Sequence, residues 1–316
     1  MPRCNPDVAA VEGWIVRTDS TIGYVKGCFQ PAPGELHYYV PRRILGEKLG
    51  KLSYSEALLT ARTVLGKDHG LVVARLSRLC GKEVILANLR KSSVRSPYDA
   101  ANSIRSCKAK VCRAAVELLD YLPGEGVGIT GSLAYDPSSS QDIDVVVYGY
   151  RNAYRAYHAL LDLRLSSVTK PLLDIKPEWT DADSELHKAL AARRVLQGVF
   201  KGYHYSVRLV SCTHASTQIP ITCSGKIQVL GVLKSLGPNY LTPTYYVIEA
   251  FEEAKSLNAR IQRLYLATYR IRYTEIPSGS VVQVYGELQL HDGLPMVVPD
   301  HGGYVKLLSL NRDANP

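Results

Sequence analysis

The chain has 316 residues, of which 46% are hydrophobic and 21% are charged, and its formal net charge is +9 at pH 7. This composition excludes an intrinsically disordered protein, and the length allows two or three domains. No apolar run approaches the ~18 residues that a membrane span needs, and the N-terminus has no apolar signal-peptide segment. We therefore expect a cytoplasmic protein without a membrane partner. The positive charge suits a nucleotide or nucleic-acid partner, and it is equally compatible with general solubility.

The seven cysteines are scattered singly along the chain: Cys4, Cys28, Cys80, Cys107, Cys112, Cys212 and Cys223. No Cys-x-x-Cys pair occurs, which argues against a zinc site of ordinary spacing. We expect mostly buried free thiols in a reducing compartment. The alternative is a disulfide between distant positions, which the cytosol of some hyperthermophiles tolerates.

Residues 1–96 predict an N-terminal α+β module. Strand patterns and turn signals alternate through residues 8–45, with Pro31-Ala32-Pro33-Gly34 as a strong turn signal, and they predict a small antiparallel sheet. A helix is predicted over Ser53–Leu65, where Ser53 and Glu56 form a capping box. Residues 71–90 contain short apolar runs that the pattern leaves unassigned.

Residues 97–214 predict a mixed α/β core. Helices are expected over residues 98–122, over residues 152–165, and from a cap at Asp183 to about Gly198, and a strand is expected over Tyr203–Val210. The first of these helices carries a row of basic side chains, which is either a solvated face or the edge of a nucleic-acid groove. The row comprises Arg105, Lys108, Lys110 and Arg113.

The most informative segment is VGITGSLAYDPSSSQDIDVVVY, residues 127–148. It predicts a strand, a Gly131-Ser132 turn, a polar loop and a second strand that begins at Asp142. Side chains alternate along a strand, so Asp142 and Asp144 share one face while the apolar residues between and after them face a core. Two such carboxylates repel each other unless a cation lies between them, and Mg²⁺ (or Mn²⁺) prefers oxygen ligands. A Gly-rich turn after a strand offers N–H groups to a phosphate.

This pattern resembles the signature of the nucleotidyltransferase superfamily, which includes DNA polymerase beta, poly(A) polymerases and CCA-adding enzymes. The family has Gly-Ser after an apolar strand and Asp-x-Asp about ten residues later, and this chain has Gly131, Ser132, Asp142 and Asp144 there. The resemblance implies that Gly131 and Ser132 hold a nucleoside triphosphate. It also implies that Asp142 and Asp144 bind the metals of an in-line displacement at the α-phosphorus. The alternative is a loop between two core strands whose aspartates are solvated.

A second segment is similar to one in uncharacterised archaeal nucleotidyltransferases. It has the basic pair Arg193-Arg194, a Gly-aromatic step from Gly198 to Gly202, and then the strand Tyr203–Val210. Arg193 and Lys201 are candidates to neutralise phosphate charge.

One departure from the family concerns its third carboxylate, which lies on a later strand beside the first two. The expected strand has Ser206 and Arg208 at the corresponding positions. Asp174 is a candidate substitute, and Arg208 is either a phosphate contact or a surface arginine. Because the third carboxylate helps to activate the attacking hydroxyl, its absence weakens the case for turnover.

Residues 215–316 predict an all-β domain. Strands are expected over residues 219–230, 244–250, 261–274, 281–290 and 296–298, and their spacing predicts an OB-like barrel, a fold that commonly binds single-stranded nucleic acid. Basic and aromatic side chains interleave there, as in either a nucleic-acid surface or an ordinary half-exposed strand. They are Arg260, Arg263, Tyr265, Tyr269, Arg270, Arg272 and Tyr273.

The sequence therefore predicts an α+β protein whose central nucleotidyltransferase-type sheet is flanked by an N-terminal α+β module and a C-terminal OB-like barrel. The leading hypothesis is Mg²⁺-dependent transfer of a nucleoside monophosphate from a nucleoside triphosphate to a hydroxyl of a nucleic acid or protein. The alternative is a catalytically degenerate protein of this fold that binds nucleic acid.

Overall fold

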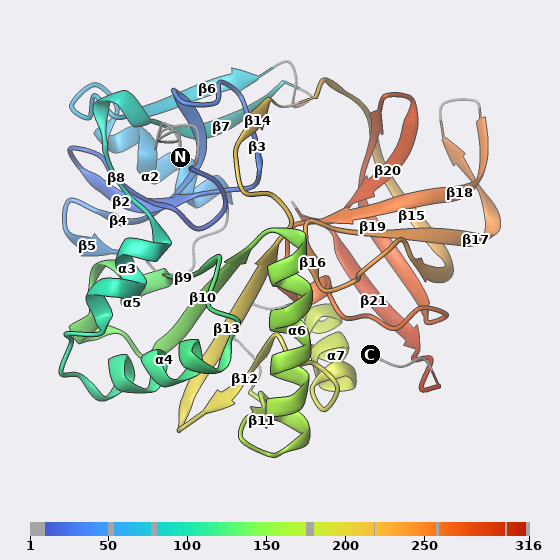
Figure 1. The fold of residues 1–316 in the computed structure, drawn as a ribbon. Helices are drawn as coiled ribbons and strands as arrows, with labels where there is room; N and C mark the ends of the chain where they lie inside the picture. The colour runs from blue at the N-terminus through green and yellow to red at the C-terminus, as the bar shows by residue number, and fades with distance from the viewer. Residues whose placement is uncertain are drawn as a thin grey trace. The chain divides into compact units, whose positions relative to one another are not determined.

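The computed structural model describes residues 10–49, 54–76, 81–174, 180–217, 219–256, 259–300 and 302–313. The chain divides into two compact units: Met1–Leu163 with Val199–Ile219, and Arg164–Gly198 with Pro220–Pro316. Helices and several separate sheets make up these units, so the predicted mixed α+β class is confirmed (Figure 1). Within the part of the chain that is described, no helix is both long enough and apolar enough to cross a membrane.

The first unit begins with an antiparallel sheet, as residues 8–45 predicted. Its strands lie in the order β6 (Leu71–Leu76), β7 (Lys82–Asn88), β4 (Leu36–Ile44), β2 (Thr21–Val25), β1 (Ile15–Arg17) and β8 (Ser93–Arg95), and β5 (Glu47–Lys48) pairs with β4. The unassigned apolar runs are thus β6 and β7. Helix α2 (Tyr54–Val64) agrees with the predicted helix, whose expected cap Ser53 lies outside the described residues.

A second sheet in the first unit contains both strands of the Gly-Ser and Asp-x-Asp pattern. Strand β10 (Asp142–Tyr148) pairs antiparallel with β9 (Val127–Thr130) and parallel with β13 (Tyr203–Val210), and β12 (Gln197–Phe200) borders β13. The alternate residues Ile143, Val145 and Val147 are at most 1% exposed. Burial of this face explains why an apolar alternation beginning at Asp142 folds as a strand.

Four helices accompany this sheet: α3 (Pro97–Ile104), α4 (Lys110–Tyr121), α5 (Gly131–Tyr135) and α6 (Tyr150–Leu165). The single helix predicted over residues 98–122 is wrong, because the chain leaves the helix after Ile104. Tight turns follow, in which the Ser106 and Cys107 N–H groups donate to carbonyls three residues earlier. The four basic residues therefore do not share one helix face, and Arg105 instead pairs with Asp120 at 3.1 Å.

The end of β10 and β13 packs against the N-terminal sheet. Val146, Tyr148 and Val210 belong to the same buried cluster as Trp14 and Val16. The Tyr148 hydroxyl donates to the carbonyl oxygen of Glu12 at 2.6 Å. The two sheets of the first unit therefore share a core, and the face of β10 that carries Asp142 and Asp144 is the face turned toward the N-terminal sheet.

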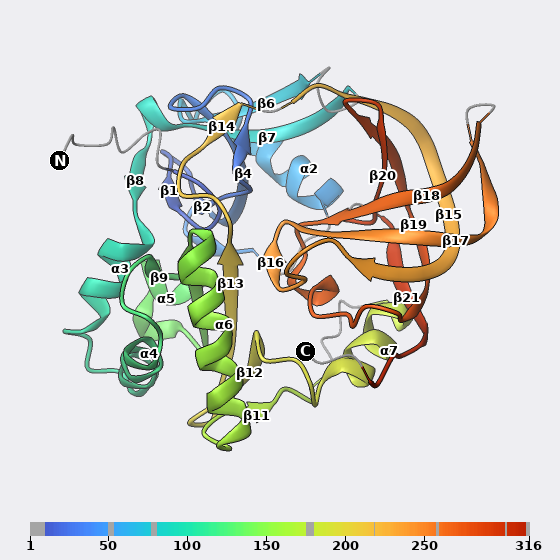
Figure 2. The ribbon, with the colours of Figure 1, turned by 45° about the vertical axis from the view of Figure 1, so that its right-hand side comes forward.

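The second unit contains a closed five-stranded barrel. Its strands follow the order β15 (Ile221–Ser235), β17 (Thr244–Ser256), β18 (Ala259–Thr268), β20 (Leu294–Val298) and β19 (Val281–His291), and the β15–β19 pairing closes the ring (Figure 2). All pairs are antiparallel except β18 with β20, which is parallel. Strand β21 (Tyr304–Ser309), which was not predicted, extends the sheet beside β19.

Helix α7 (Asp181–Leu190) belongs to the same unit, and its Leu186 and Leu190 join the core of the barrel. The helix ends at Leu190, so the prediction that it reaches Gly198 is wrong.

The strand expected over residues 261–274 also ends early, at Thr268. There the Thr268 hydroxyl and the Tyr269 N–H bind the carboxylate of Asp300 at 2.6 and 2.7 Å, and the chain turns into a 3-10 helix, Ile271–Tyr273. Further two-residue strands in the described part of the chain are β11 (Lys170–Pro171), β14 (Ser216–Thr217) and β16 (Leu241–Thr242).

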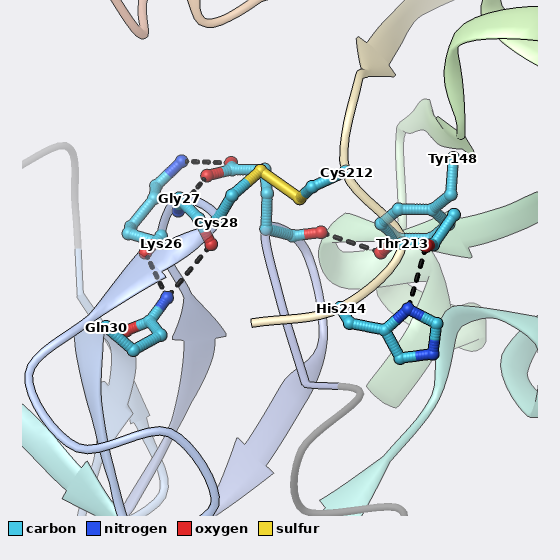
Figure 3. Close-up of a disulfide and its surroundings, with 9 residues drawn as sticks. Lys26, Gly27, Cys28, Gln30, Tyr148, Cys212, Thr213 and His214 are labelled. Carbon is cyan, nitrogen blue, oxygen red and sulfur yellow. Dashed lines mark hydrogen bonds and ion pairs between the residues drawn. A yellow bond between two sulfur atoms is a disulfide. The ribbon is translucent and has the colours of Figure 1, made fainter. Parts of the chain in front are cut away.

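Disulfide bonds overturn the expectation of free thiols. Cys28 is joined to Cys212, with their Cα atoms 6.1 Å apart (Figure 3). Cys107 is joined to Cys112, and Cys223 is also disulfide-bonded. Cys28 precedes β3 (Phe29–Gln30), which pairs in parallel with β14. The Cys28–Cys212 bond and this strand pair therefore fasten the N-terminal sheet to the chain that leaves β13.

Removing the Cys28–Cys212 bond is expected to lower the free energy of unfolding of the first unit by about 2–5 kcal/mol, because a cross-link over long sequence separation restricts the unfolded chain strongly. The two cysteines are 184 residues apart. Cys28→Ser with Cys212→Ser would be compared with Cys107→Ser with Cys112→Ser, whose bond spans only five residues. Denaturant unfolding, followed by Trp14 fluorescence in a Trp179→Phe background, is the measurement. Equal losses in the two double variants would contradict the prediction.

Candidate nucleotide site

The turn after β9 brings the backbone of Gly131 against the side chain of Asp144. Gly131 has a φ of +68°, in the left-handed region that glycine tolerates best. A Cβ added there would lie 2.1 Å from Asp144 Oδ2 and 2.7 Å from Asp144 Cβ. Only glycine therefore allows this approach, and the position where a side chain would stand is occupied by a carboxylate.

Asp142 and Asp144 lie on the same face at the start of β10, as predicted. Asp142 is exposed and Asp144 is half-buried. The hydroxyl of Ser132 is 3.4 Å from Asp142 Oδ1 and 2.9 Å from the hydroxyl of Ser140, which in turn donates to the Asp142 carbonyl at 3.0 Å. Four of the predicted residues thus meet at one place: Gly131, Ser132, Asp142 and Asp144.

Ser206 lies beside Asp144 on the neighbouring strand. The parallel register of β10 and β13 pairs Asp144 with Ser206 and Val146 with Arg208. The Ser206 hydroxyl donates to Asp144 Oδ1 at 2.8 Å. At the register position next to Asp144 this chain therefore has a hydroxyl instead of a carboxylate.

The charge of Arg208 is directed toward Glu12 of the N-terminal segment. Arg208 Nε is 3.4 Å from Glu12 Oε1, and Lys26 Nζ is 2.7 Å from the same oxygen. Burial alone would raise the pKa of Glu12, but the charges of Lys26 and Arg208 and the hydrogen bonds from Lys26 and from the Gly27 N–H hold that pKa below its ordinary value. Glu12 is thus an ionised, buried carboxylate that anchors two cations near the end of the sheet.

Of the remaining three predicted site residues, one belongs to the first unit and two belong to the second. Lys201, in the turn between β12 and β13, pairs with Glu117 of α4. Arg193 and Asp174 belong to the second unit, where Arg193 Nη1 donates to the carbonyl oxygens of Asn311 and Arg312 at 3.3 Å each and Asp174 is exposed after β11. The first unit therefore assembles four of the seven predicted residues.

The donor set at the carboxylate pair fits a hard divalent cation. Asp142 and Asp144 supply carboxylate oxygens on one face, and Ser132 adds a hydroxyl. Mg²⁺ commonly takes one or two protein carboxylates and completes its shell with water and substrate phosphate. In the described part of the chain, no group of three or more His, Cys, Asp or Glu side chains is placed to hold a metal.

Residues of the N-terminal sheet also border the site, and the sequence pattern did not identify them. Arg43 of β4 pairs with Asp136, the residue after α5, at 2.5 Å. Tyr24 of β2 and Tyr135 of α5 have ring centroids 6.2 Å apart. The sequence feature that could have identified these residues is the basic pair Arg42-Arg43 at the end of a strand. By itself, such a pair does not indicate which residues it contacts.

The barrel also brings aromatic and basic side chains together outside the segment in which they were predicted. Arg270 donates to the carbonyl oxygen of Asp300, and Arg272 Nε is 3.1 Å from the buried carboxylate of Asp183. The side chains of these two arginines thus stabilise the fold. Arg263 is exposed, and the side chain of Arg260 lies outside the described residues. On β19 and β21, by contrast, the rings of Tyr285 and Tyr304 are 5.7 Å apart. Lys226 Nζ lies 5.3 Å from the centroid of Tyr285.

No protein-family model, no curated protein and no solved structure matches this chain. What the chain does is therefore inferred from its own residues and their geometry.

Proposed function

We propose that this protein is a Mg²⁺-dependent nucleotidyltransferase that moves a nucleoside monophosphate from a nucleoside triphosphate to a hydroxyl of a nucleic acid or protein and releases pyrophosphate. The observation that carries the proposal is the approach of the Gly131 backbone to the Asp144 carboxylate, with Asp142 and Ser132 beside it. A phosphate-binding turn and a paired carboxylate are the two parts that this chemistry requires in one place.

Each of the four residues has a defined task in this proposal. Asp142 and Asp144 would hold Mg²⁺, which neutralises charge on the triphosphate when it is bound. The hydroxyl of Ser132 and the N–H groups of the Gly131-Ser132 turn would donate to phosphate oxygens. Ser206 would orient Asp144 by donating to Oδ1, which leaves Oδ2 on the Gly131 side of the carboxylate.

A nucleic-acid acceptor is supported by the barrel. The barrel places its first, second, third, fifth and fourth strands side by side, with the third and fifth parallel. This is the strand order of OB-type barrels, which bind single-stranded nucleic acid. The pair Tyr285–Tyr304 with Lys226 offers rings for base stacking and a cation for the backbone.

The alternative function, a nucleic-acid-binding protein with a degenerate core, is favoured by one observation. Ser206 occupies the register position beside Asp144 where the family has its third carboxylate. A hydroxyl donor at that position cannot accept the proton of an attacking hydroxyl as a carboxylate does. Such a protein would keep the phosphate turn and lose turnover.

The test is transfer of label from α-labelled nucleoside triphosphates, with Mg²⁺ or Mn²⁺, to a pool of RNA, DNA and protein acceptors. Asp142→Asn with Asp144→Asn is expected to lower transfer by about 1,000-fold or more, because metal charge stabilisation supplies several kcal/mol. Asp120→Asn, an exposed carboxylate of α4, is the matched control and should transfer normally. Absence of transfer by the unaltered chain, with nucleic-acid binding retained in the double variant, would contradict the enzyme and favour the alternative.

A further inference from the structure

Helix α6 of the first unit exposes aromatic and basic side chains along its N-terminal half. Two tyrosines there are more than half exposed, at 57% and 52%. Two arginines and a histidine beside them are exposed as well, and the first carboxylate of the helix follows only at Asp162. We call these five residues the α6 stripe: Tyr150, Arg151, Tyr154, Arg155 and His158.

Helical spacing arranges the α6 stripe in two parallel rows. Residues four apart lie on one face of a helix, about 6 Å from each other along its axis. Tyr150, Tyr154 and His158 therefore form a row of rings, and the ring centroids of Tyr154 and His158 are 4.3 Å apart. Arg151 and Arg155 form a row of guanidinium groups next to it. Rings and cations thus run side by side over one continuous surface.

Packing of the core does not account for these side chains. Helix α6 buries a separate face made of Ala153, Ala156, Tyr157, Leu160 and Leu163. Tyr157 is 2% exposed and fills the core as an aromatic residue ordinarily does. The rings of the α6 stripe are not needed for that contact. Neighbouring large apolar groups that remain in water are typical of an interaction site.

The charges of the α6 stripe are placed against the stability of the helix. Acidic side chains near a helix N-terminus are favourable and basic ones are unfavourable, because the N-terminus carries a partial positive charge. Helices α2, α3 and α7 have Glu56, Asp99 and Asp181 in their first turns. The first turn of α6 has Arg151 and no acidic residue. The helix end and the guanidinium groups therefore reinforce one positive surface, which is complementary to an anion.

Exposed rings beside exposed cations fit a polyanion that also has planar groups. Single-stranded nucleic acid has both, because its phosphates bind arginine and its unpaired bases stack on aromatic side chains. A duplex keeps its bases stacked on one another, and an acidic peptide has no bases. Either of these could use the guanidinium groups but would leave the row of rings without a role.

We propose that the α6 stripe binds single-stranded nucleic acid, with bases stacked on Tyr150 and Tyr154 and phosphates bound by Arg151 and Arg155. The bound strand would be the acceptor, so the inference rests on the nucleic-acid acceptor of the proposed function. It adds to that function a binding surface on the same unit as the candidate nucleotide site.

The position of α6 defines which part of the acceptor the stripe would hold. Strand β10 begins at Asp142 and ends at Tyr148, and α6 begins at Tyr150. The side-chain amide of Asn152 donates to the carbonyl oxygen of Tyr148 at 3.0 Å and fastens the first turn of α6 to the end of β10. The length of β10, roughly 23 Å for seven residues, therefore separates the first ring of the stripe from the carboxylate pair. The stripe would bind the acceptor several nucleotides away from its reacting hydroxyl.

The test is fluorescence anisotropy titration of labelled oligo(dT) and oligo(U) with the full chain, without metal or nucleotide, at several salt concentrations. Arg151→Ala with Arg155→Ala is expected to weaken binding by about 10-fold or more. It should also reduce the slope of log affinity against log salt by about 1.4, since each phosphate contact on a single strand contributes about 0.7. Tyr150→Ala with Tyr154→Ala should weaken binding by about 10- to 100-fold and leave the slope unchanged, because stacking releases no counterions.

Matched variants separate these contacts from general effects of charge and folding. Arg17→Ala with Arg90→Ala removes the same charge from two exposed positions of the N-terminal region and should bind normally. Tyr150→Phe with Tyr154→Phe keeps both rings and should also bind normally. Equal thermal unfolding of all the variants verifies that each one is folded.

The other outcomes overturn the inference in distinguishable ways. Binding by both alanine double variants as tight as by the unaltered chain would reject the α6 stripe and leave the proposed function standing. Equal binding of duplex and single strand, with no effect of removing the tyrosines, would reject base stacking and assign the arginines to a duplex. Absence of oligonucleotide binding by the unaltered chain would reject the inference, whereas label transfer to a protein acceptor would still support the enzyme.

Discussion

Gly131→Ala is expected to destabilise the first unit by about 3 kcal/mol or more and to abolish Mg²⁺-dependent binding of an α,β-methylene nucleoside triphosphate analogue, measured by calorimetric titration. Two costs add. A left-handed conformation costs a non-glycine residue roughly 1–2 kcal/mol, and Gly131 has a φ of +68°. The new Cβ would also meet Asp144 Oδ2 at 2.1 Å and Asp144 Cβ at 2.7 Å. Because Asp144 Cβ is fixed to strand β10, rotation of the carboxylate cannot relieve the clash, and the turn must move away from the strand.

Gly202→Ala separates these two costs. Gly202 has a φ of +83°, and a Cβ added there would meet nothing within 4 Å. We expect that variant to lose only the conformational term of about 1 kcal/mol and to bind the analogue normally. Denaturant unfolding followed by Trp14 fluorescence in a Trp179→Phe background gives the free energies. If both variants lost the same stability and bound equally, the contact between Gly131 and Asp144 would not be what shapes the site.

The part of the site that the sequence predicted is the part that is local in the chain. Gly131, Ser132, Asp142 and Asp144 lie within 14 residues, and strand alternation alone places both carboxylates on one face. Strand β13 was predicted with the bounds that it has, and β10 was predicted to begin at Asp142, as it does. Patterns of this length need no knowledge of distant partners.

Features that depend on pairing between distant segments could not be predicted in this way. Arg43 reaches the end of α5 through a β2–β4 ladder and an ion pair with Asp136, 93 residues away. The helix expected over residues 98–122 breaks at the Cys107–Cys112 bond, although helical periodicity continues through the break. Arg272 alternates like a surface residue, yet its carboxylate partner Asp183 lies on α7 and is buried. Periodicity indicates which face a residue takes and gives no information about what covers that face.

Glu275→Ala is expected to destabilise the second unit by about 3–5 kcal/mol, because removing one partner leaves a buried charge uncompensated. Arg194 and Glu275 have side chains only 1% and 4% exposed, with Arg194 Nε 3.6 Å from Glu275 Oε2. The Val195 N–H also donates to Glu275 Oε1 at 2.8 Å. Burial raises the pKa of Glu275 while the Arg194 charge opposes that rise. The Glu275 carboxylate therefore accepts from one buried backbone N–H and compensates one buried guanidinium. Without it, both groups stay buried and lose this partner.

The size of this effect distinguishes a buried ion pair from ordinary packing. Glu249→Ala, at an exposed position on β17, should change stability by less than about 0.5 kcal/mol. Replacing both partners, Arg194→Met with Glu275→Leu, should cost less than Glu275→Ala alone, because no unpaired charge remains. Denaturant unfolding followed by circular dichroism gives the free energies, and hydrogen exchange of peptides from β15 and β19 assigns the loss to the barrel. A double variant at least as unstable as Glu275→Ala would show that the lost packing, and not the orphaned guanidinium, sets the cost. Arg194 would then be a shape-filling residue whose charge is incidental to the barrel.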